Sequence, residues 1–319
     1  MIDLGVNDDQ RQMVEGAVAL LAEHAPVARL RPSGKPVDPH RAIAEWGWFG
    51  VGLPEARGGL GLGVAEEMLL AFEAGRHLLS PSVAATTLAA HLAPEDVLAA
   101  LLTGEARAAL ALATGRDVLA FDVEGASLIA VVDGEEVWLA QVSAFRGTTV
   151  SGFDEAVYAS RGTVDRASRL ASEPAFRARL LIAASLAGIA RATCDLAVAY
   201  AKVREQFGQP IGAFQAVKHI CADMGVRAYA AEAQVRMAAA ACADTPDAGA
   251  FQIGAAALTA LRAARTNAED AIQVHGGIGF TAECEAHFYL KRAHLLGQLL
   301  GGTDACRTRI LAERAPEVA

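Results

Sequence analysis

The 319-residue sequence lacks the positive charge that a nucleic-acid-binding surface requires. It has 28 lysines and arginines against 37 aspartates and glutamates, which gives a formal net charge of −9. A protein that binds along nucleic acid needs a basic stripe that neutralises phosphates, and none is visible. A few local arginines can still bind an anionic cofactor. The charge balance therefore excludes nucleic acid as a partner but leaves nucleotide ligands open.

Cysteine is sparse, and a leader or a membrane-spanning run is not visible. The five cysteines lie in the C-terminal half in apolar, helix-like contexts and form no CxxC pair, which favours a reducing compartment. The start has no basic segment followed by an apolar run. The most apolar stretch, around Leu180 to Ala190, is interrupted by Gly188 and is too short to cross a bilayer. We therefore expect a cytoplasmic protein with no membrane span, whose apolar excess lies in helix faces and a subunit interface.

Aromatic residues make up only 6% of the chain, and Val/Ile/Thr-rich alternating runs are confined to one central stretch. Apolar residues at helical spacing predict a helical domain over residues 1–105. Short β-like runs and the hairpin signal Asp133-Gly134 predict a small, truncated β domain over residues 106–165. Four long amphipathic segments predict a four-helix bundle over residues 166–319. The predicted fold class is mainly α.

Two stretches have the residue types that a dinucleotide site needs. The first reads REQFGQPIGAFQ from Arg204 to Gln215, and the second reads QVHGGIGF from Gln273 to Phe280. A pyrophosphate needs a cationic fork or main-chain N–H groups, which Arg204 and the Gly276-Gly277 pair can provide. Phe207 offers an apolar surface, and the amides of Gln215 and Gln273 can donate and accept at a polar nucleotide edge. The alternative is that Arg204 pairs with Glu205 at the surface and the glycines only end helices.

Together with Val51-Gly52-Leu53-Pro54-Glu55 and the following Gly58-Gly59-Leu60-Gly61, these stretches resemble the signatures of the acyl-CoA dehydrogenase superfamily, in that family's order. The resemblance implies an acyl-CoA dehydrogenase-like fold, FAD as the cofactor and an acyl-CoA as the substrate. It also implies that Arg204, Phe207, Gln215, Gln273, Gly276 and Gly277 contact an FAD held mainly by the neighbouring subunit.

The same resemblance shows that the catalytic carboxylate is missing. Removal of an α-proton needs a base, commonly a carboxylate with a raised pKa in a dry pocket. One family position for this base is Gly301, before Gly302-Thr303, and the other is Ala178, before Arg179-Leu180. Neither residue can accept a proton, so we expect no catalytic residue in this chain. Asp304 is the remaining candidate, although we favour it as an N-cap of the last helix.

The flavin-ring segment also departs from the family. Residues 109–116 read ALALATGR and lack the family's Thr-Glu-Pro and Gly-Ser-Asp elements, while Trp138 is expected in the sheet core. Glu173 is expected on a solvated turn beside Pro174. The chain therefore keeps the nucleotide half of a flavin site and lacks the ring half, which makes it similar to the shortened subunit of actinobacterial heterotetrameric steroid side-chain acyl-CoA dehydrogenases. The implied partner is a longer catalytic acyl-CoA dehydrogenase subunit.

Three other interpretations remain open. The chain could be a homo-oligomeric dehydrogenase that uses Asp304, or a non-enzymatic assembly scaffold. A metal site is the third, because His275, Cys284, His287 and His294 lie close in sequence. Their spacing matches no zinc pattern, so we expect no metal.

Overall fold

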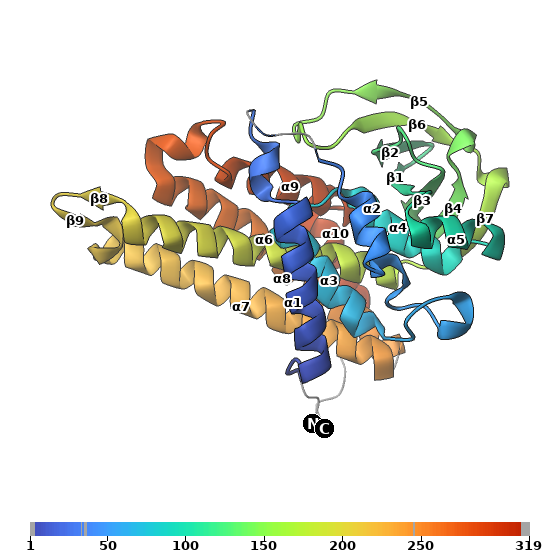
Figure 1. Ribbon diagram of the computed structural model, residues 1–319, viewed down its shortest axis with the longest axis horizontal. Helices are drawn as coiled ribbons and strands as arrows, with labels where there is room; N and C mark the ends of the chain where they lie inside the picture. Colours follow the sequence, from blue (N-terminus) through green and yellow to red (C-terminus); the bar gives the residue numbers. More distant parts are fainter. Residues whose placement is uncertain (1–3, 33, 35–36, 245, 314–319) are drawn as a thin grey trace.

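The computed structural model describes residues 4–32, 34, 37–244 and 246–313. Figure 1 shows a sheet at one end of the molecule, long helices that extend away from it, and shorter N-terminal helices between them. The order of helices, sheet and helices along the chain agrees with the prediction.

Local capping signals set the ends of the N-terminal helices. Asn7 accepts a hydrogen bond from the main-chain N–H of Gln10 and completes a capping box at the start of the first helix. Ser80 caps the fourth helix, with Pro81 in its first turn, and Gly104 ends the fifth in a left-handed conformation at φ +77°. The elements are α1 (Asp8–His24), η1 (Val27–Leu30), α2 (His40–Glu45), η2 (Trp48–Gly50), η3 (Glu55–Arg57), α3 (Val64–Arg76), α4 (Pro81–Leu92) and α5 (Glu95–Thr103).

The central region is a seven-stranded sheet in the order β5-β6-β2-β1-β3-β4-β7. Only β1 and β3 run parallel among these neighbours. The predicted Asp133-Gly134 turn joins β3 to β4, and Trp138 is 2% exposed, so both predictions are confirmed. The strands are β1 (Ala108–Thr114), β2 (Asp117–Phe121), β3 (Leu128–Asp133), β4 (Glu136–Gln141), β5 (Phe145–Val150), β6 (Ala159–Val164) and β7 (Arg169–Pro174).

Strand β7 lies beyond residue 165, where the sequence placed the end of the β domain. It pairs antiparallel with β4 along the sheet edge and leads directly into the first helix of the bundle. Its sequence, RLASEP, has no apolar run because most of its side chains are exposed. A half-exposed edge strand therefore gives little sequence signal.

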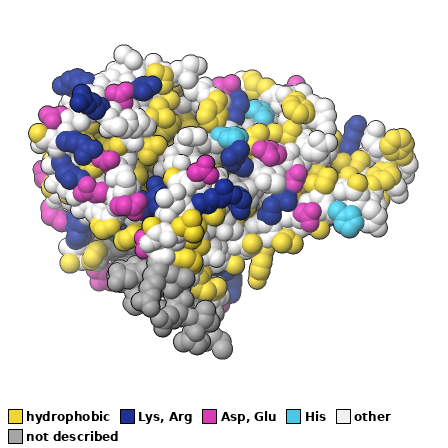
Figure 2. Space-filling view, turned by 180° about the vertical axis from the view of Figure 1, so that it is seen from behind, with side chains coloured by type: hydrophobic (Ala, Val, Ile, Leu, Met, Phe, Trp, Pro, Cys, Tyr) yellow, Lys and Arg dark blue, Asp and Glu magenta, His cyan; other side chains and the backbone are white. Residues whose placement is uncertain are grey.

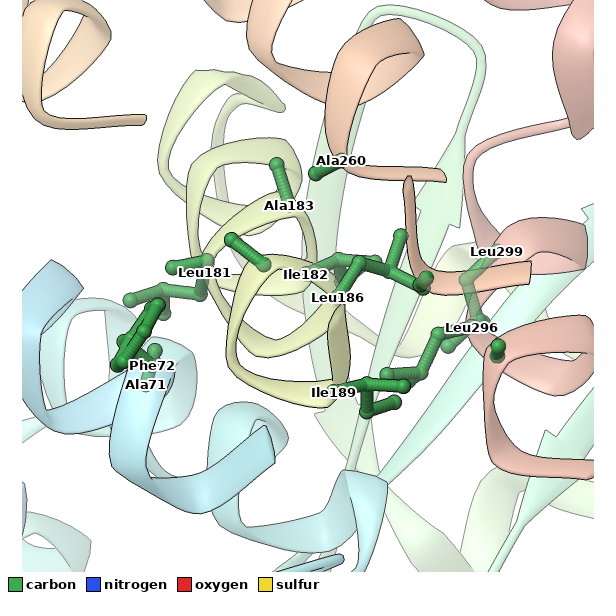
Figure 3. Packing of buried hydrophobic residues seen from close by; sticks show 14 of the residues in the cluster. Ala71, Phe72, Leu181, Ile182, Ala183, Leu186, Ile189, Ala260, Leu296 and Leu299 are labelled. Carbon is green, nitrogen blue, oxygen red and sulfur yellow. The ribbon is translucent and has the colours of Figure 1, made fainter. Parts of the chain in front are cut away.

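The C-terminal region is built around α6, which packs against α3, α8 and α9. Figure 3 shows Leu181, Ile182 and Ile189 of α6 among side chains of these neighbours. Gly75 and Gly188 allow α3 and α6 to approach closely, since a Cβ on either would collide with a carbonyl oxygen of the other helix. The bundle elements are α6 (Phe176–Val203), α7 (Gln215–Asp244), α8 (Pro246–His275), η7 (Gly276–Phe280), α9 (Ala286–Leu299) and α10 (Gly302–Ala312).

Helix α6 has 28 residues and is long and apolar enough to cross a membrane, so the expectation that this stretch is too short was wrong. Gly188 does not interrupt the helix, because it sits where α3 comes close. Of the apolar window in α6, 67% is buried inside the protein. The packing against α3 and α8 therefore accounts for its apolar character.

A buried ion pair joins all three regions. Arg292 of α9 is 2% exposed, and its Nε donates to Asp154 Oδ2 at 2.7 Å from the β5–β6 connection. Its Nη1 donates to the carbonyl oxygens of Leu78 (2.9 Å) and Leu79, in the turn between α3 and α4. Asp154 is 4% exposed. One guanidinium thus fixes the N-terminal helices and the sheet to the bundle.

Glu173 belongs to a second buried cluster, which corrects its expected place on a solvated turn. It lies in β7, and its Oε1 is buried without a hydrogen-bond partner. Burial raises the pKa of Glu173, while Arg177 and His91 oppose this shift and Glu67 adds to it. Glu67 itself is 3% exposed, accepts from His91 Nε2 at 2.6 Å and pairs with Arg177. The sequence gave no signal for this cluster because its members are far apart along the chain.

Replacing Arg292 with leucine should destabilise the protein by about 3–5 kcal/mol, because Asp154 would remain buried without a counter-ion. Urea unfolding of wild type and variant measures this loss. The matched control is Arg307→Leu, which removes an exposed pair with Asp304 and should cost less than about 1 kcal/mol. Equal losses for the two variants would contradict the role given to Arg292.

Glu173→Gln should stabilise the protein at pH 7 and have little effect near pH 4. The folded-state pKa of Glu173 lies above its usual value, so the folded protein binds this proton more tightly than the unfolded chain. Stability from this group is therefore present at low pH and is lost as pH rises through the folded-state pKa. Urea unfolding across pH 4–7 tests this, with exposed Glu105→Gln as the control. A destabilised Glu173→Gln protein at pH 7 would refute the prediction.

Candidate cofactor site

The first candidate motif forms a tight hairpin at the far end of α6. Arg204 is the C-cap of this helix, and Ile211 returns its main-chain N–H to the Arg204 carbonyl at 2.7 Å. Between the short strands β8 (Glu205–Gln206) and β9 (Gln209–Pro210), Phe207 and Gly208 adopt left-handed conformations with φ of +53° and +76°. Two left-handed residues are typical of a type I′ turn, in which asparagine normally takes the first position.

The second candidate motif lies at the end of α8, on the same end of the bundle (Figure 1). His275 stacks on Tyr200 of α6 with ring centroids 4.2 Å apart, and its Nδ1 lies 2.7 Å from the carbonyl oxygen of Ala271. Gly276 turns the chain with φ +64° into η7. The structure therefore brings together the two stretches that are about sixty residues apart in sequence.

The predicted side chains point away from the chain's own core. Arg204, Phe207, Gln215 and Gln273 are all exposed, and Phe207 is 93% exposed. Within the described residues, the side chains of Arg204, Gln215 and Gln273 make no hydrogen bond or ion pair, so the expected alternative pair of Arg204 with Glu205 does not form. The ring of Phe207 lies edge-on to the ring of Phe214, with the two centroids 6.1 Å apart. Figure 2 shows hydrophobic side chains gathered on this projecting end, where Val203 and Phe280 are 76% and 82% exposed.

The open space around Gly277 bears on whether a phosphate-containing cofactor fits at this end of the bundle. A Cβ added to Gly277 would meet no atom of this chain within 4 Å, and its φ is not in the left-handed region. Neither packing nor backbone conformation within the chain therefore requires glycine at this position. An open surface at Gly277, with the exposed Arg204 guanidinium on the same end of the bundle, fits the anionic pyrophosphate of FAD.

The two positions expected for a catalytic base are unable to carry one. Ala178 is 1% exposed in the core, and Gly301 has φ +78°, which is strained for any other residue. A Cβ at Gly301 would also lie 2.8 Å from the Cβ of Ala305. In this chain the backbone at Gly301 therefore disfavours any side chain there.

Asp304 is neither a buried base nor the N-cap that the sequence favoured. The N-cap of α10 is Gly301, and Asp304 lies in the first turn of the helix. Its side chain is 96% exposed and pairs with Arg307 at 3.4 Å. The cap prediction was wrong because the helix begins three residues earlier than an N-cap at Asp304 would require. The chain enters the helix through two left-handed glycines, Gly301 and Gly302.

A cluster of charged side chains that the sequence did not predict lies beside Ala178 and Gly301. Glu135, in the β3–β4 turn, accepts two hydrogen bonds from Arg179 and one from Arg309 of α10. The Arg179 guanidinium lowers the pKa of the Glu135 carboxyl, with Arg309 adding to the effect. A carboxylate held ionised between two arginines is a poor proton acceptor, so Glu135 does not replace the missing base.

Among the described residues, no group of three or more His, Cys, Asp or Glu side chains could hold a metal ion. His287 Nδ1 lies 2.7 Å from the Cys284 carbonyl, and His294 meets the ring of Phe153. All five cysteines are free thiols.

Both helical regions match known protein-family domains. The N-terminal domain of acyl-CoA dehydrogenases matches residues 7–108, and the C-terminal domain of acyl-CoA dehydrogenases matches residues 168–315. The sheet lies mostly between the two matched ranges.

Two curated relatives from Mycobacterium tuberculosis match most of the chain. Acyl-CoA dehydrogenase IpdE2 is 36% identical over 321 residues, which cover 96% of this chain and 97% of IpdE2. Acyl-CoA dehydrogenase FadE34 is 38% identical over 294 residues, which cover 85% of this chain but only 41% of FadE34. The chain thus spans less than half the length of FadE34.

Solved structures share the fold at lower identity. A variant of the steroid ACAD Tcur3481-Tcur3483 matches with a TM-score of 0.80 and 24% identity, over 97% of this chain and 98% of that chain. The ChsE4-ChsE5 complex from Mycobacterium tuberculosis matches with a TM-score of 0.79 and 20% identity, over 99% of this chain and 100% of that chain. With the two matched domains and the relatives of similar length, these findings show that the chain belongs to the acyl-CoA dehydrogenase family.

Proposed function

We propose that this chain is the partner subunit of a cytoplasmic FAD-dependent acyl-CoA dehydrogenase. In this proposal it contributes the nucleotide half of the FAD site across an interface with a longer catalytic subunit. The observation that supports it best is the projecting end of the bundle, where Arg204, Phe207, Gln215 and Gln273 are exposed and poorly satisfied within the chain. Exposed apolar and aromatic side chains gathered beside an arginine are typical of a surface that binds another molecule.

Each residue has a distinct task in the proposed site. Arg204 binds pyrophosphate oxygens through a charge-assisted fork, and Gly276-Gly277 lets the main chain approach the same phosphates. Phe207 packs its ring against the dinucleotide, while Gln215 and Gln273 orient polar edges by hydrogen bonding. FAD, when bound, supplies the acceptor for the hydride removed from the β-carbon of an acyl-CoA. This chain supplies no base for the α-proton, so the catalytic subunit must provide it.

The alternative of a homo-oligomeric enzyme with Asp304 as the base has less support. The Asp304 carboxylate is 96% exposed and pairs with Arg307, so it has no dry pocket around it, whereas a base for this reaction works in one. The left-handed Gly301 and the Arg179–Glu135–Arg309 cluster also leave no catalytic carboxylate nearby. The scaffold alternative does not account for the unpartnered groups on the projecting end.

The lengths and titles of the relatives agree with a two-part enzyme. More than half of FadE34 lies outside its match to this chain, which is enough length for a second subunit in the same polypeptide. ChsE4-ChsE5 is described as a complex, and Tcur3481-Tcur3483 as a steroid ACAD of two named components. We therefore propose a heterotetramer with a longer acyl-CoA dehydrogenase, and a steroid side-chain thioester as the acyl-CoA substrate.

Co-expression with the longer acyl-CoA dehydrogenase that co-purifies with this chain from its own host tests the proposal. The chain alone should contain no FAD and show no turnover with an acyl-CoA and an artificial electron acceptor, because it lacks the base and the ring segment. The co-expressed pair should carry stoichiometric FAD and be active, as measured by flavin absorbance and acceptor reduction. Turnover by the chain alone, or an active pair in which this chain can be omitted, would refute the proposal.

Arg204→Ala in the assembled pair should weaken FAD retention by about tenfold or more, because a charge-assisted hydrogen bond contributes about 1.5–3 kcal/mol. Flavin released during dialysis against increasing salt measures retention. Lys202→Ala is the matched control, since Lys202 is exposed two residues before Arg204 on α6 and is assigned no role. Gly277→Ala should also weaken retention without changing the chain's own stability, because its Cβ meets nothing within the chain. Retention equal to wild type in both variants would remove this end of the bundle from the flavin site.

A further inference from the structure

A cleft with a volume of about 700 Å³ lies where the three regions of the chain meet. Its walls come from the α1–α2 connection, the turn between α3 and α4, the start of β1, the β2–β3 and β5–β6 connections, and Arg292 of α9. No residue of the two flavin motifs lines it. Its volume falls in the range of sites that enclose small molecules.

Two strained residues form part of this cleft. Among the described residues, only Leu78, Asp122 and Phe207 adopt left-handed conformations without being glycine, and the first two line the cleft, at φ +51° and +54°. The Leu78 carbonyl accepts from both Arg29 Nη2 and Arg292 Nη1, each at 2.9 Å. Asp122 accepts from Ser80 Oγ and from the main-chain N–H of Tyr158. Such conformations persist where surrounding contacts fix them, and they concentrate at ligand sites.

Arg29 leaves an unbalanced positive charge in the wall. Within the described residues it forms no ion pair, and its Nη1 and Nη2 donate to main-chain carbonyls at the ends of α1 and α3. Burial, and then the nearby Arg292, lower the pKa of Arg29 to about 10. No carboxylate is among the groups that cause this shift. Within the described residues Arg29 Nε makes no hydrogen bond, and Arg29 lines the cleft.

Arg107 adds a second guanidinium with donors to spare. Its Nη2 pairs with Asp38 at 2.6 Å, while its Nε and Nη1 make no hydrogen bond within the part of the chain that the structure describes. Leu30, Val37 and Val83 supply apolar wall between these charges. Asp122 and Glu124 also line the cleft and would repel a ligand that carries several anionic groups, such as a nucleoside triphosphate.

We propose that this cleft binds an organic anion that carries one carboxylate or phosphate monoester group on an apolar body. The anionic group lies at Arg29 and Arg107, and the apolar body lies against Leu30, Val37 and Val83. None of the residues assigned to the flavin site belongs to this proposed site. The alternative is that Arg29 only caps the ends of α1 and α3, in which case anions would have no preference for the cleft.

Isothermal titration of the full chain with octanoate, octyl phosphate and neutral octanol tests the proposal. At least one anion should bind tenfold or more tightly than octanol, since a charged hydrogen bond contributes enough free energy for that difference. The stronger of the two anions identifies the headgroup. Binding of octanol as tight as that of both anions, or no anion binding at millimolar concentration, would overturn the proposal.

Two variants locate the binding, and both avoid Arg29 because its loss would disturb two helix ends. Arg107→Gln should weaken anion binding about tenfold, and Ala156→Trp should block it by filling the cleft from the β5–β6 connection. Arg161→Gln, in an exposed pair with Asp117 outside the cleft, is the matched control and should bind as wild type does. If Arg107→Gln and Ala156→Trp both bind like the control, the anion lies elsewhere and the assignment fails. FAD content of the co-expressed pair should stay unchanged in all three variants, which separates this test from that of the flavin site.

Discussion

The architecture depends on the buried positive charge of Arg292. Arg292 is 2% exposed, and its donors reach a carboxylate of the sheet region and two carbonyls of the turn between α3 and α4. Burying a guanidinium is unfavourable unless its charge and donors are satisfied together, so the three regions have to meet in one arrangement. That arrangement fixes the start of α6 against the sheet. Because α6 is a single rigid helix of 28 residues, it also fixes the position of Arg204 at the other end.

The projecting end of the bundle follows from that geometry. Tyr200 stacks on His275, which fastens the end of α6 to the end of α8 and brings the hairpin and η7 to one surface. Inside the bundle, Asn267 is fully buried and donates to carbonyls of Ala190 and Met224 while accepting from Arg227. These contacts set the register of three helices. The candidate cofactor groups themselves contribute almost nothing to the fold, since they are exposed and make few contacts within the chain.

Sequence patterns predicted the parts of the structure that depend on residues close together in the sequence. Helical periodicity predicted the bundle, and Asp133-Gly134 predicted its hairpin because the turn chemistry is contained in adjacent residues. Contacts between distant residues gave no such signal. The Glu67–His91 pair and the Arg179–Glu135–Arg309 cluster join elements that only the tertiary fold brings together, and β7 was missed because an edge strand needs no apolar run. Asp304 was misjudged for a related reason: a helix can begin through left-handed glycines without any side-chain cap.

Phe207 combines an unfavourable backbone conformation with an almost fully exposed side chain. A left-handed conformation costs a non-glycine residue about 1–2 kcal/mol, and a phenylalanine that is 93% exposed recovers none of that by burial. Leu78 and Asp122 adopt the same conformation, but each is held by hydrogen bonds from several elements of this chain. Among the described residues, the aromatic ring that Phe207 meets is Phe214, in edge contact, and the β8–β9 pairing holds the turn. In the proposed assembly, a cofactor held by a second subunit would cover Phe207 at the same surface as Arg204 and would offset part of this cost.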